Sequence, residues 1–491
     1  MGSEGQAAPS LKSQVLSGLG WKAGAKLLGQ LVSWAITIFV IRLLAPSDYG
    51  LLAMAAIFVS FLTLMTELGL EPAMVQSKTL EEGNIRNIFG LLLMIDGSLC
   101  ALLFLAAPSA ASFFNEPRLI EILRVLAFQF ILMAFTTIPS AMLRRRMNFK
   151  LQSIVELTAT IVSGVTTLGL ALAGKGVWAL VLGNLAGALA LMIASNIAIP
   201  SFRLPRLSMA GTHDLLRFGG NVTFTRIIWF IYTQADIFIA SKLLGKEAVG
   251  IYSVSMHLAS LPSQKLSAVI NQVAFPAFAQ IQSDPQRVAS NVLLALRVIC
   301  FITFPICFGM SSVAPELVQV VLGPNWIAAT LPLLLICLVI PLRLLSTALT
   351  STTDGLGRPD VTFKTVITAV VVMPIAFLLG CKFGSTGLAL AWVIGFPIVF
   401  FENLKRILPI IGVSWHQFFD TLLPPVAVSV GMFAAVTGIR WLLADRVPIL
   451  AQLAVLIVSG AAAYVVLSYL FNRDGLTEAT GLIKRKGNAL G

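Results

Sequence analysis

The stretch Arg42-Leu-Leu-Ala-Pro-Ser-Asp-Tyr-Gly50 ends one long apolar run and opens the next, and about 200 residues later Lys242-Leu-Leu-Gly-Lys-Glu-Ala-Val-Gly250 does the same. Two further pairs of segments keep this order at a nearly constant offset. They are Arg146-Met-Asn-Phe-Lys150 with Pro359-Asp-Val-Thr-Phe-Lys364, and Gly176-Val-Trp-Ala-Leu180 with Gly387-Leu-Ala-Leu-Ala391. The shared order predicts an internal duplication, in which each copy is built from long apolar segments.

The composition indicates which solvent surrounds these segments. The 491 residues include 34 basic and 22 acidic ones, so that 11% of the chain is charged, against about 25% in a typical soluble domain. Hydrophobic residue types make up 57%, and the mean hydropathy is +0.90. So few charges could not cover the surface of a soluble chain this long. A cytosolic enzyme, a secreted module and a disordered scaffold are therefore excluded, and the chain is expected in a lipid bilayer.

A transmembrane helix needs about 20 apolar residues. Segments of this kind are predicted at 15–43, 48–76, 86–108, 119–143, 151–173, 177–200, 216–243, 248–280, 288–312, 327–352, 361–380, 385–404, 417–442 and 448–470. Six spans per copy is an even number, so both copies enter the membrane from the same side. The predicted fold is an all-α integral membrane protein with about 14 transmembrane helices, arranged as two pseudo-symmetric six-helix lobes and a C-terminal helical hairpin.

The domain boundaries follow from this count. We expect an N-terminal lobe at 1–200, a C-terminal lobe at 201–410, the extra hairpin at 411–472 and a cytoplasmic tail at 473–491. The loops on the side of the N-terminus carry most of the Lys and Arg, which predicts cytoplasmic N- and C-termini. Two such lobes would enclose a central cleft that rocking opens to either face. The hairpin would either form a lipid groove or cover the bundle.

Basic residues at membrane depth are the candidates for binding. An ionised side chain at the bilayer centre costs several kcal/mol unless it faces water or a partner. Lys22 and Arg124 lie close enough to a span end to extend to the interface. The deeper cations, which we predict to line a hydrated cavity and bind substrate, are Lys26, Arg226, Lys265, Arg297 and Arg343. Salt bridges between helices are the competing interpretation for these five.

Acidic residues at the same depth have two interpretations. Glu67, Asp96 and Asp236 would be counter-ions of the deep cations, or they would bind a coupling proton or sodium ion. No Walker motif (GxxxxGK[ST]) occurs, so ATP bound to this chain is not expected to power transport. The five cysteines and three histidines are scattered, which predicts neither a metal site nor another cofactor. No nucleophile and base are grouped as in a transferase, so an enzyme is not expected.

An anion with an apolar tail would suit such an interior. Fixed cations supply charge-assisted hydrogen bonds to a phosphate or pyrophosphate. The apolar tail would stay in lipid, reached through a gap between the two lobes. The residues alone therefore predict a secondary-type transporter for an amphiphilic anion.

The opening motifs resemble a known family. Leu44-Ala-Pro-Ser-Asp-Tyr-Gly-Leu51, followed by Glu67-Leu-Gly-Leu70 and Ala73-Met-Val-Gln76, is similar to the beginning of the Wzx-type polysaccharide flippases. Arg144-Arg-Arg-Met-Asn-Phe-Lys150 and Lys242-Leu-Leu-Gly245 fit the same family. It belongs to the MOP superfamily, together with the MATE drug exporters and the lipid II flippases. The resemblance runs through about residues 12–410 and is greatest to the colanic-acid and xanthan-type exporters.

This resemblance implies a function. Its members move an undecaprenyl-pyrophosphate-linked oligosaccharide repeat unit across the bacterial inner membrane, from the cytoplasmic to the periplasmic leaflet, for exopolysaccharide or lipopolysaccharide assembly. A polymerase and a chain-length regulator of the same pathway are the implied partners, and no nucleic acid is. The implied fold is the V shape of two six-helix lobes around a cationic central cavity. No family motif identifies the five deep cations individually, so their assignment depends on depth alone.

Three alternatives remain open from the sequence. A MATE-like drug or ion antiporter would need acidic residues in the cavity, which the excess of deep cations disfavours. A lipid II flippase has a compatible size. A membrane-embedded glycosyltransferase or ligase would use the same carrier lipid, but it would need large periplasmic loops, and only about 313–326 is expected to be more than a few residues long.

Overall fold

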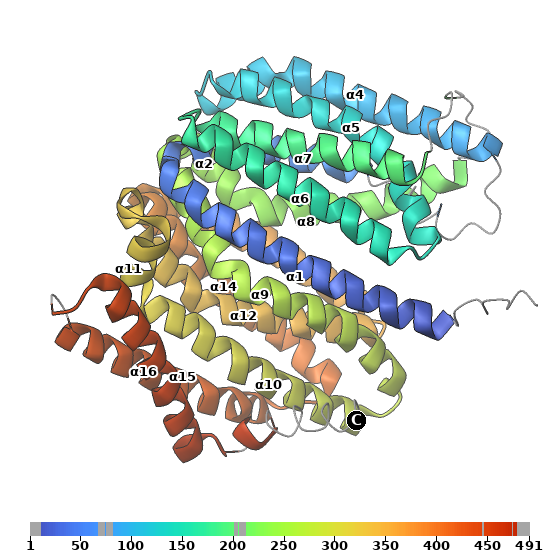
Figure 1. Ribbon diagram of the computed structural model, residues 1–491. Coiled ribbons are helices and arrows are strands. Elements are labelled where there is room, and N and C mark those ends of the chain that lie inside the picture. Colours follow the sequence, from blue (N-terminus) through green and yellow to red (C-terminus); the bar gives the residue numbers. More distant parts are fainter. Residues whose placement is uncertain are drawn as a thin grey trace, which may run out of the picture. The chain divides into compact units, whose positions relative to one another are not determined.

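The computed structural model describes residues 11–66, 74, 82–200, 205, 213–443, 446–473 and 475–478. Over these residues the predicted segments all form helices (Figure 1), which confirms the all-α membrane fold with about 14 helices. The long helices are α1 (Leu11–Leu43), α2 (Pro46–Thr66), α4 (Glu82–Phe114), α5 (Leu119–Arg145), α6 (Phe149–Leu172), α7 (Val177–Ala198), α8 (His213–Leu243), α9 (Gly245–Ile281), α10 (Pro285–Ser312), α12 (Thr330–Gly355), α13 (Pro359–Gly380), α14 (Gly384–Ile411), α15 (Trp415–Leu443) and α16 (Ile449–Phe471).

Ten helical stretches of the described residues are long and apolar enough to cross a membrane by length and composition. Helix α13 shows how such a helix divides its surface. Every fourth residue is buried, namely Val361, Thr365, Ala369, Met373 and Phe377. A second stripe is exposed and apolar, namely Phe363, Ile367, Val371 and Ile375. The 3.6-residue period places these stripes on different faces, so that one packs against protein and the other suits lipid.

The described helices fall into two compact units, Met1–Phe230 and Ile231–Gly491. In the first unit, α2 packs against α4, α5 and α7, α4 against α5, α5 against α7, and α6 against α7. In the second unit, α9 packs against α10, α12 and α14, α10 against α12, α12 against α14, and α13 against α14. Each of these pairs in the first unit has its counterpart among those of the second, in the order that the sequence repeat predicts. The helix packing therefore supports the internal duplication.

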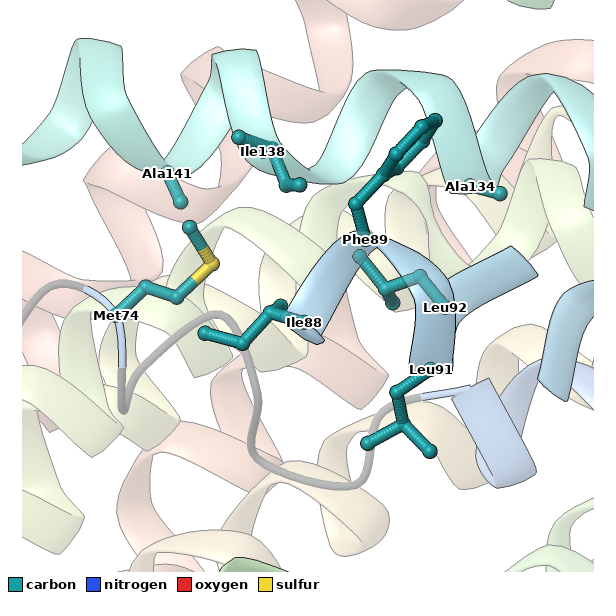
Figure 2. Packing of buried hydrophobic residues seen from close by; sticks show 8 residues of the cluster. All are labelled: Met74, Ile88, Phe89, Leu91, Leu92, Ala134, Ile138 and Ala141. Atoms are coloured by element: carbon teal, nitrogen blue, oxygen red, sulfur yellow. The ribbon is translucent and has the colours of Figure 1, made fainter. Parts of the chain in front are cut away.

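The pair α4 and α5 shows how the first unit is held together. Ile88, Phe89 and Leu92 of α4 face Ala134 and Ile138 of α5 (Figure 2). The Phe89 ring also contacts Phe135 edge-on, with ring centroids 5.4 Å apart. Small residues on α5 opposite large ones on α4 let the two helices interdigitate, as dense packing requires.

Asp48, in the segment Arg42–Gly50, has a structural role in the first unit. Its carboxylate accepts a hydrogen bond from the Ala45 backbone N–H at 3.1 Å, at the beginning of α2. It also accepts one from the Val177 backbone N–H at 3.0 Å, at the beginning of α7. A carboxylate stabilises the positive ends of helices. Asp48 therefore joins the starts of two helices that are far apart in the sequence.

Helices α6 and α7 approach each other closely because α7 has glycines on the contact face. A Cβ added to Gly183 would lie 1.9 Å from Thr167 Oγ1, and one added to Gly187 would lie 2.7 Å from Ser163 Cβ. Both distances are too short for real atoms, so only glycine fits at these positions. The four-residue spacing of the two glycines is typical of close helix contacts in membranes.

Two prolines inside helices free a backbone carbonyl, and another helix satisfies each one. Pro139 of α5 cannot donate to the carbonyl of Phe135, and Asn196 Nδ2 of α7 donates to that oxygen at 2.9 Å. In the second unit, Pro305 of α10 leaves the carbonyl of Phe301 free. The hydroxyl of Tyr464 in α16 donates to it at 2.7 Å. Freed carbonyls in a membrane must find such partners.

We expect Tyr464→Phe to weaken the docking of α16. The change removes one hydrogen bond and leaves a buried carbonyl unpaired, which costs about 1 kcal/mol in membrane proteins. Thermal unfolding in detergent should show a Tm a few degrees lower than that of the unmodified protein. Tyr469→Phe on the same helix is the control, because Tyr469 is exposed and its ring contact to Arg473 survives the change. Equal Tm values for the two variants would contradict this role of Tyr464.

The segment after α10 differs from the expectation of a loop at about 313–326. It forms three short helical turns, α11 (Ala314–Leu317), η1 (Val318–Leu322) and η2 (Pro324–Ala329). The side chain of Trp326 in this segment is 0% exposed. The segment packs inward because its apolar side chains find partners on α12, α15 and α16, including Val436 and Leu456 in one cluster with Val313. Helices α15 and α16 likewise cover α10, rather than standing apart from it.

Candidate functional site

The structure places the predicted site residues on six helices. Lys265, Arg297 and Arg343 lie on α9, α10 and α12, and Asp96 and Asp236 lie on α4 and α8. Lys26 and Arg226 belong to α1 and α8, but their side chains lie outside the described part of the chain. Glu67 lies outside the described residues altogether. Five of the eight predicted residues can therefore be examined.

Asp236 is the centre of a buried hydrogen-bonded chain in the second unit. Its carboxylate, in a residue only 4% exposed, accepts hydrogen bonds from the Tyr252 hydroxyl at 2.6 Å and from the Ile237 backbone N–H at 2.7 Å. The Tyr252 hydroxyl in turn accepts a bond from Trp392 Nε1 at 2.6 Å. Helices α8, α9 and α14 each supply one side chain. Such a fully bonded polar network holds its members in fixed positions.

Arg343 lies against the other side of this network. Its guanidinium carbon is 4.2 Å from the centroid of the Trp392 ring, and its Nη1 is 3.4 Å from the sulfur of Met256. The positive charge is close enough to act electrostatically on Asp236. Among the described residues, however, no carboxylate forms an ion pair with Arg343. The guanidinium is held by an aromatic face, and its remaining donors are available.

Arg343 lies near the middle of α12, about 18–20 Å from each end of the helix. A guanidinium at that depth must face water or an anion, because an unpaired charge in hydrocarbon is costly. The side chain is only partly buried. Its contact with Trp392 adds cation–π attraction, worth about 0.5–2 kcal/mol, and fixes the planar group in one orientation. This arrangement presents a preoriented donor fork at membrane depth.

Sequence reasoning missed Tyr252 and Trp392. Trp392 is only 2% exposed and packs against Tyr232, Phe377 and Phe396, with ring centroids 5.3–6.5 Å apart. A tryptophan in the interior of a predicted span, away from the headgroup level, was the available signal. Tyr252 gave no comparable signal, because the first turns of a span often carry tyrosine.

The other two examined cations have different surroundings. Arg297 Nη1 forms an ion pair with Glu478 at 2.6 Å, and each side chain is 29% exposed. This pair matches the interhelical salt bridge that competes with a binding role. Lys265 is exposed on α9, and it is not free, because it takes part in an interaction with another residue of the chain. Of the three described deep cations, Arg343 is thus the one whose geometry best suits an external anion.

Asp96 occupies a different environment in the first unit. The residue is 0% exposed, and neither carboxylate oxygen has a hydrogen-bond partner in the described part of the chain. It lies near the middle of α4, fourteen residues after Glu82. No described cation forms an ion pair with it. An ionised carboxylate without partners would cost several kcal/mol, which favours the neutral acid.

An apolar groove lies beside the Arg343 site in the second unit. It has a volume of about 650 Å³ and is lined by α9, α10 and α12. Leu266, Phe278, Leu294, Ile302 and Leu344 are among its lining residues. Along α9 the lining extends from Leu266 to Ile281, which corresponds to about 22 Å of helix. Among the described residues, no group of His, Cys, Asp and Glu side chains could hold a metal ion.

The fold defines a multi-pass membrane protein. The family model described as "Polysaccharide biosynthesis protein" matches residues 39–331, which is more than half of the chain. The chain belongs to this polysaccharide biosynthesis protein family, and within it the chain is a transporter of the flippase type and not an enzyme. The resemblance to the Wzx-type flippases is thus confirmed at the level of the family.

Curated relatives match most of the chain. Lipopolysaccharide biosynthesis protein WzxC of Escherichia coli (strain K12) is 24% identical and covers 86% of each chain. Teichuronic acid biosynthesis protein TuaB of Bacillus subtilis (strain 168) is 22% identical, over 94% of this chain and 96% of that protein. Succinoglycan biosynthesis transport protein ExoT of Rhizobium meliloti (strain 1021) is 25% identical, over 82% and 80%.

Solved structures match the fold. The lipid II flippase MurJ in an inward closed conformation has a TM-score of 0.73 at 14% identity, covering 92% of this chain and 99% of that one. An inward-facing multidrug resistance transporter of the MATE family has a TM-score of 0.59 at 14% identity, covering 79% and 96%. The fold of the chain is therefore similar to those of MurJ and the MATE transporters.

Proposed function

We propose that this protein moves an undecaprenyl-pyrophosphate-linked oligosaccharide repeat unit from the cytoplasmic to the periplasmic leaflet of the bacterial inner membrane. The observation that carries the proposal is Arg343, a cation at membrane depth that is stacked on Trp392 and has no carboxylate partner among the residues that the structure describes. The export would precede polymerisation, with a polymerase and a chain-length regulator as pathway partners. Both chain termini would lie in the cytoplasm.

The chemistry of Arg343 supports an anionic headgroup as the ligand. A guanidinium makes two parallel charge-assisted hydrogen bonds to a phosphate, and its planar geometry is conserved when one face is stacked on an indole. Trp392 is held in place by its hydrogen bond to the Tyr252 hydroxyl, which is itself bonded to Asp236. A cationic drug would be repelled here, so this site supports a phosphate-bearing substrate rather than the cargo of a drug exporter.

The groove on α9, α10 and α12 supports an apolar tail on the same substrate. Its lining is predominantly hydrocarbon, and Leu344 at its inner end directly follows Arg343 in α12. A pyrophosphate at Arg343 could therefore have the first part of a polyprenyl chain in this groove, while the remainder stays in lipid. One end of the ligand would be bound by charge and the other by burial of apolar surface.

The named relatives support the pathway. WzxC is named as a lipopolysaccharide biosynthesis protein, TuaB as a teichuronic acid biosynthesis protein, and ExoT as a succinoglycan biosynthesis transport protein. We propose that the chain groups with the colanic-acid and xanthan-type exporters, and these similarities support that proposal. We also propose alternating access of the cationic site to the two leaflets, driven by a coupling ion. The orphaned carboxyl of Asp96 supports a proton as that ion, because sodium needs several oxygen ligands.

Reconstitution tests this function directly. Proteoliposomes would contain the full chain and the undecaprenyl-pyrophosphate-linked repeat unit from the strain that encodes the protein. A glycosidase or lectin added outside the liposomes would detect only the sugar in the outer leaflet. We expect the protein to expose the sugar on the opposite leaflet faster than empty liposomes do. Lipid II and a cationic dye serve as comparison substrates. Faster movement of either one, with none of the repeat unit, would contradict the proposal.

A further inference from the structure

A second pocket lies within the first unit, at a distance in sequence from the cation site. It has a volume of about 490 Å³, within the range of small-molecule sites, and is lined by α1, α2, α6 and α7. Its polar lining includes Ser33 and Thr37 of α1, Ser163 of α6 and Asn184 of α7. All of the described lining residues are uncharged.

The polar groups of this pocket lie inside the membrane. Thr37 is about 9 Å from the end of α1, Ser163 about 14 Å from the end of α6, and Asn184 about 10 Å from the start of α7. The apolar cluster of Val40, Leu44, Ala171 and Ala179 lies between the pocket and those helix ends. Water in the headgroup region therefore does not account for polar side chains here.

These groups have no partner within the described protein. Hydroxyls in membrane helices usually donate to a backbone carbonyl one turn earlier, as Thr158, Thr160 and Thr167 do on α6. Ser33, Thr37, Ser163 and Asn184 make no such bond with any described residue. Unpaired donors and acceptors at membrane depth cost free energy unless a ligand or water satisfies them. The lining therefore suits a polar ligand that forms hydrogen bonds with these groups.

The position of the four groups depends on the glycine contact of α7. Gly183 and Gly187 bring α7 so close to α6 that Ser163 lies against Gly187. Because of this close approach, Asn184 and Ser163 line the same pocket as Ser33 and Thr37 of α1. Three helices thus present neutral donors and acceptors to one space.

We propose that this pocket binds neutral sugar residues of the transported oligosaccharide. This proposal depends on the proposed function in one respect, namely that the transported substrate carries an oligosaccharide. Hydroxyl and amide groups both donate and accept, which matches the hydroxyls of a sugar. A phosphate would require cations, which the lining lacks. A bare metal cation would favour carboxylates, which the lining also lacks.

The test uses the full-length protein in nanodiscs and two separate probes. One is the repeat-unit oligosaccharide released from its lipid by mild acid, so that it has neither phosphate nor polyprenyl chain. The other is undecaprenyl phosphate, which has no sugar. Binding of each would be measured by calorimetry for Thr37→Val, Ser163→Ala and Asn184→Leu. Thr158→Val is the matched control, because Thr158 lies on α6 outside the pocket lining.

We expect each pocket variant to weaken oligosaccharide binding about 3- to 10-fold, as the loss of one neutral hydrogen bond predicts. Undecaprenyl phosphate binding should stay the same in these variants, and Thr158→Val should change neither. Arg343→Gln should show the opposite pattern. Thr37 is exposed and valine has nearly its shape, so this variant is expected to fold normally.

Two results would overturn the proposal. One is oligosaccharide binding within twofold of the unmodified protein in all three pocket variants. The other is a sodium-binding signal in calorimetry that the unmodified protein shows and the pocket variants lose, while their oligosaccharide binding is unchanged. That result would identify the pocket as an ion site instead. Failure of the transport function is separable: pocket-dependent oligosaccharide binding without movement of the lipid-linked substrate would support this site and contradict the flippase function.

Discussion

Replacing Arg343 by glutamine is expected to reduce movement of the lipid-linked oligosaccharide by about 10- to 100-fold. A hydrogen bond to a charged group contributes about 1.5–3 kcal/mol, and glutamine keeps a polar amide but loses the charge and the planar fork. Arg343→Lys should give an intermediate rate, because it retains the charge without bidentate geometry. The measurement is the initial rate of sugar exposure in proteoliposomes, together with the affinity for undecaprenyl phosphate.

A matched control separates this effect from general damage. Arg473 also has its guanidinium over an aromatic ring, 4.8 Å from the centroid of Tyr469, but it lies beyond the end of α16. Arg473→Gln should leave the transport rate unchanged. A rate for Arg343→Gln that equals this control would contradict the anion site.

The support of Arg343 by Trp392 can be tested in the same assay. Trp392→Leu removes the stacked face and the donor to Tyr252, while Arg343 itself remains. We expect a smaller loss of transport than in Arg343→Gln and a raised concentration of substrate for half-maximal rate, because the guanidinium becomes less oriented. A change in the amount of folded protein alone, with no change in substrate dependence, would indicate a purely structural role.

The helices could be predicted from the sequence because the bilayer imposes a strict length and polarity rule. Their exact ends are less predictable. Helix α4 continues to Phe114 although its predicted span ends at 108, since a proline such as Pro108 is tolerated inside a membrane helix. The segment at about 313–326 was expected as a loop, because its short apolar turns are too brief to show helical periodicity. Its packing depends on α15 and α16, which follow more than 80 residues later.

The candidate site was only partly predictable. Depth along a helix identified Arg343 as unusual, but it identified Arg297 equally well. The partner of Arg297 is Glu478, 181 residues further along the chain, and no local pattern indicates that contact. Trp392 was overlooked because its role depends on which helices surround it. Sequence thus shows where a charge would be costly, while the fold determines what satisfies it.

Asp96→Asn is expected to leave the fold intact and to abolish stimulation of transport by a proton gradient. The carboxyl is fully buried and has no hydrogen-bond partner among the described residues, so the neutral acid is favoured and asparagine is a close substitute in shape. The substitution removes the group that would gain and lose a proton. Proteoliposomes with and without an imposed pH difference provide the measurement, and a sodium gradient alone should have no effect on either protein.

The control for Asp96 is Asp420→Asn, because Asp420 is exposed near the start of α15 and pairs with His416 there. That variant should keep the full response to the pH difference. If Asp96→Asn also keeps it, Asp96 is a buried neutral acid without a part in coupling, and the proton must act elsewhere. If Asp96→Asn loses the response but retains the rate measured without a gradient, the defect lies in energy coupling and not in substrate binding. That separation is expected physically, because Asp96 and Arg343 belong to different units of the chain.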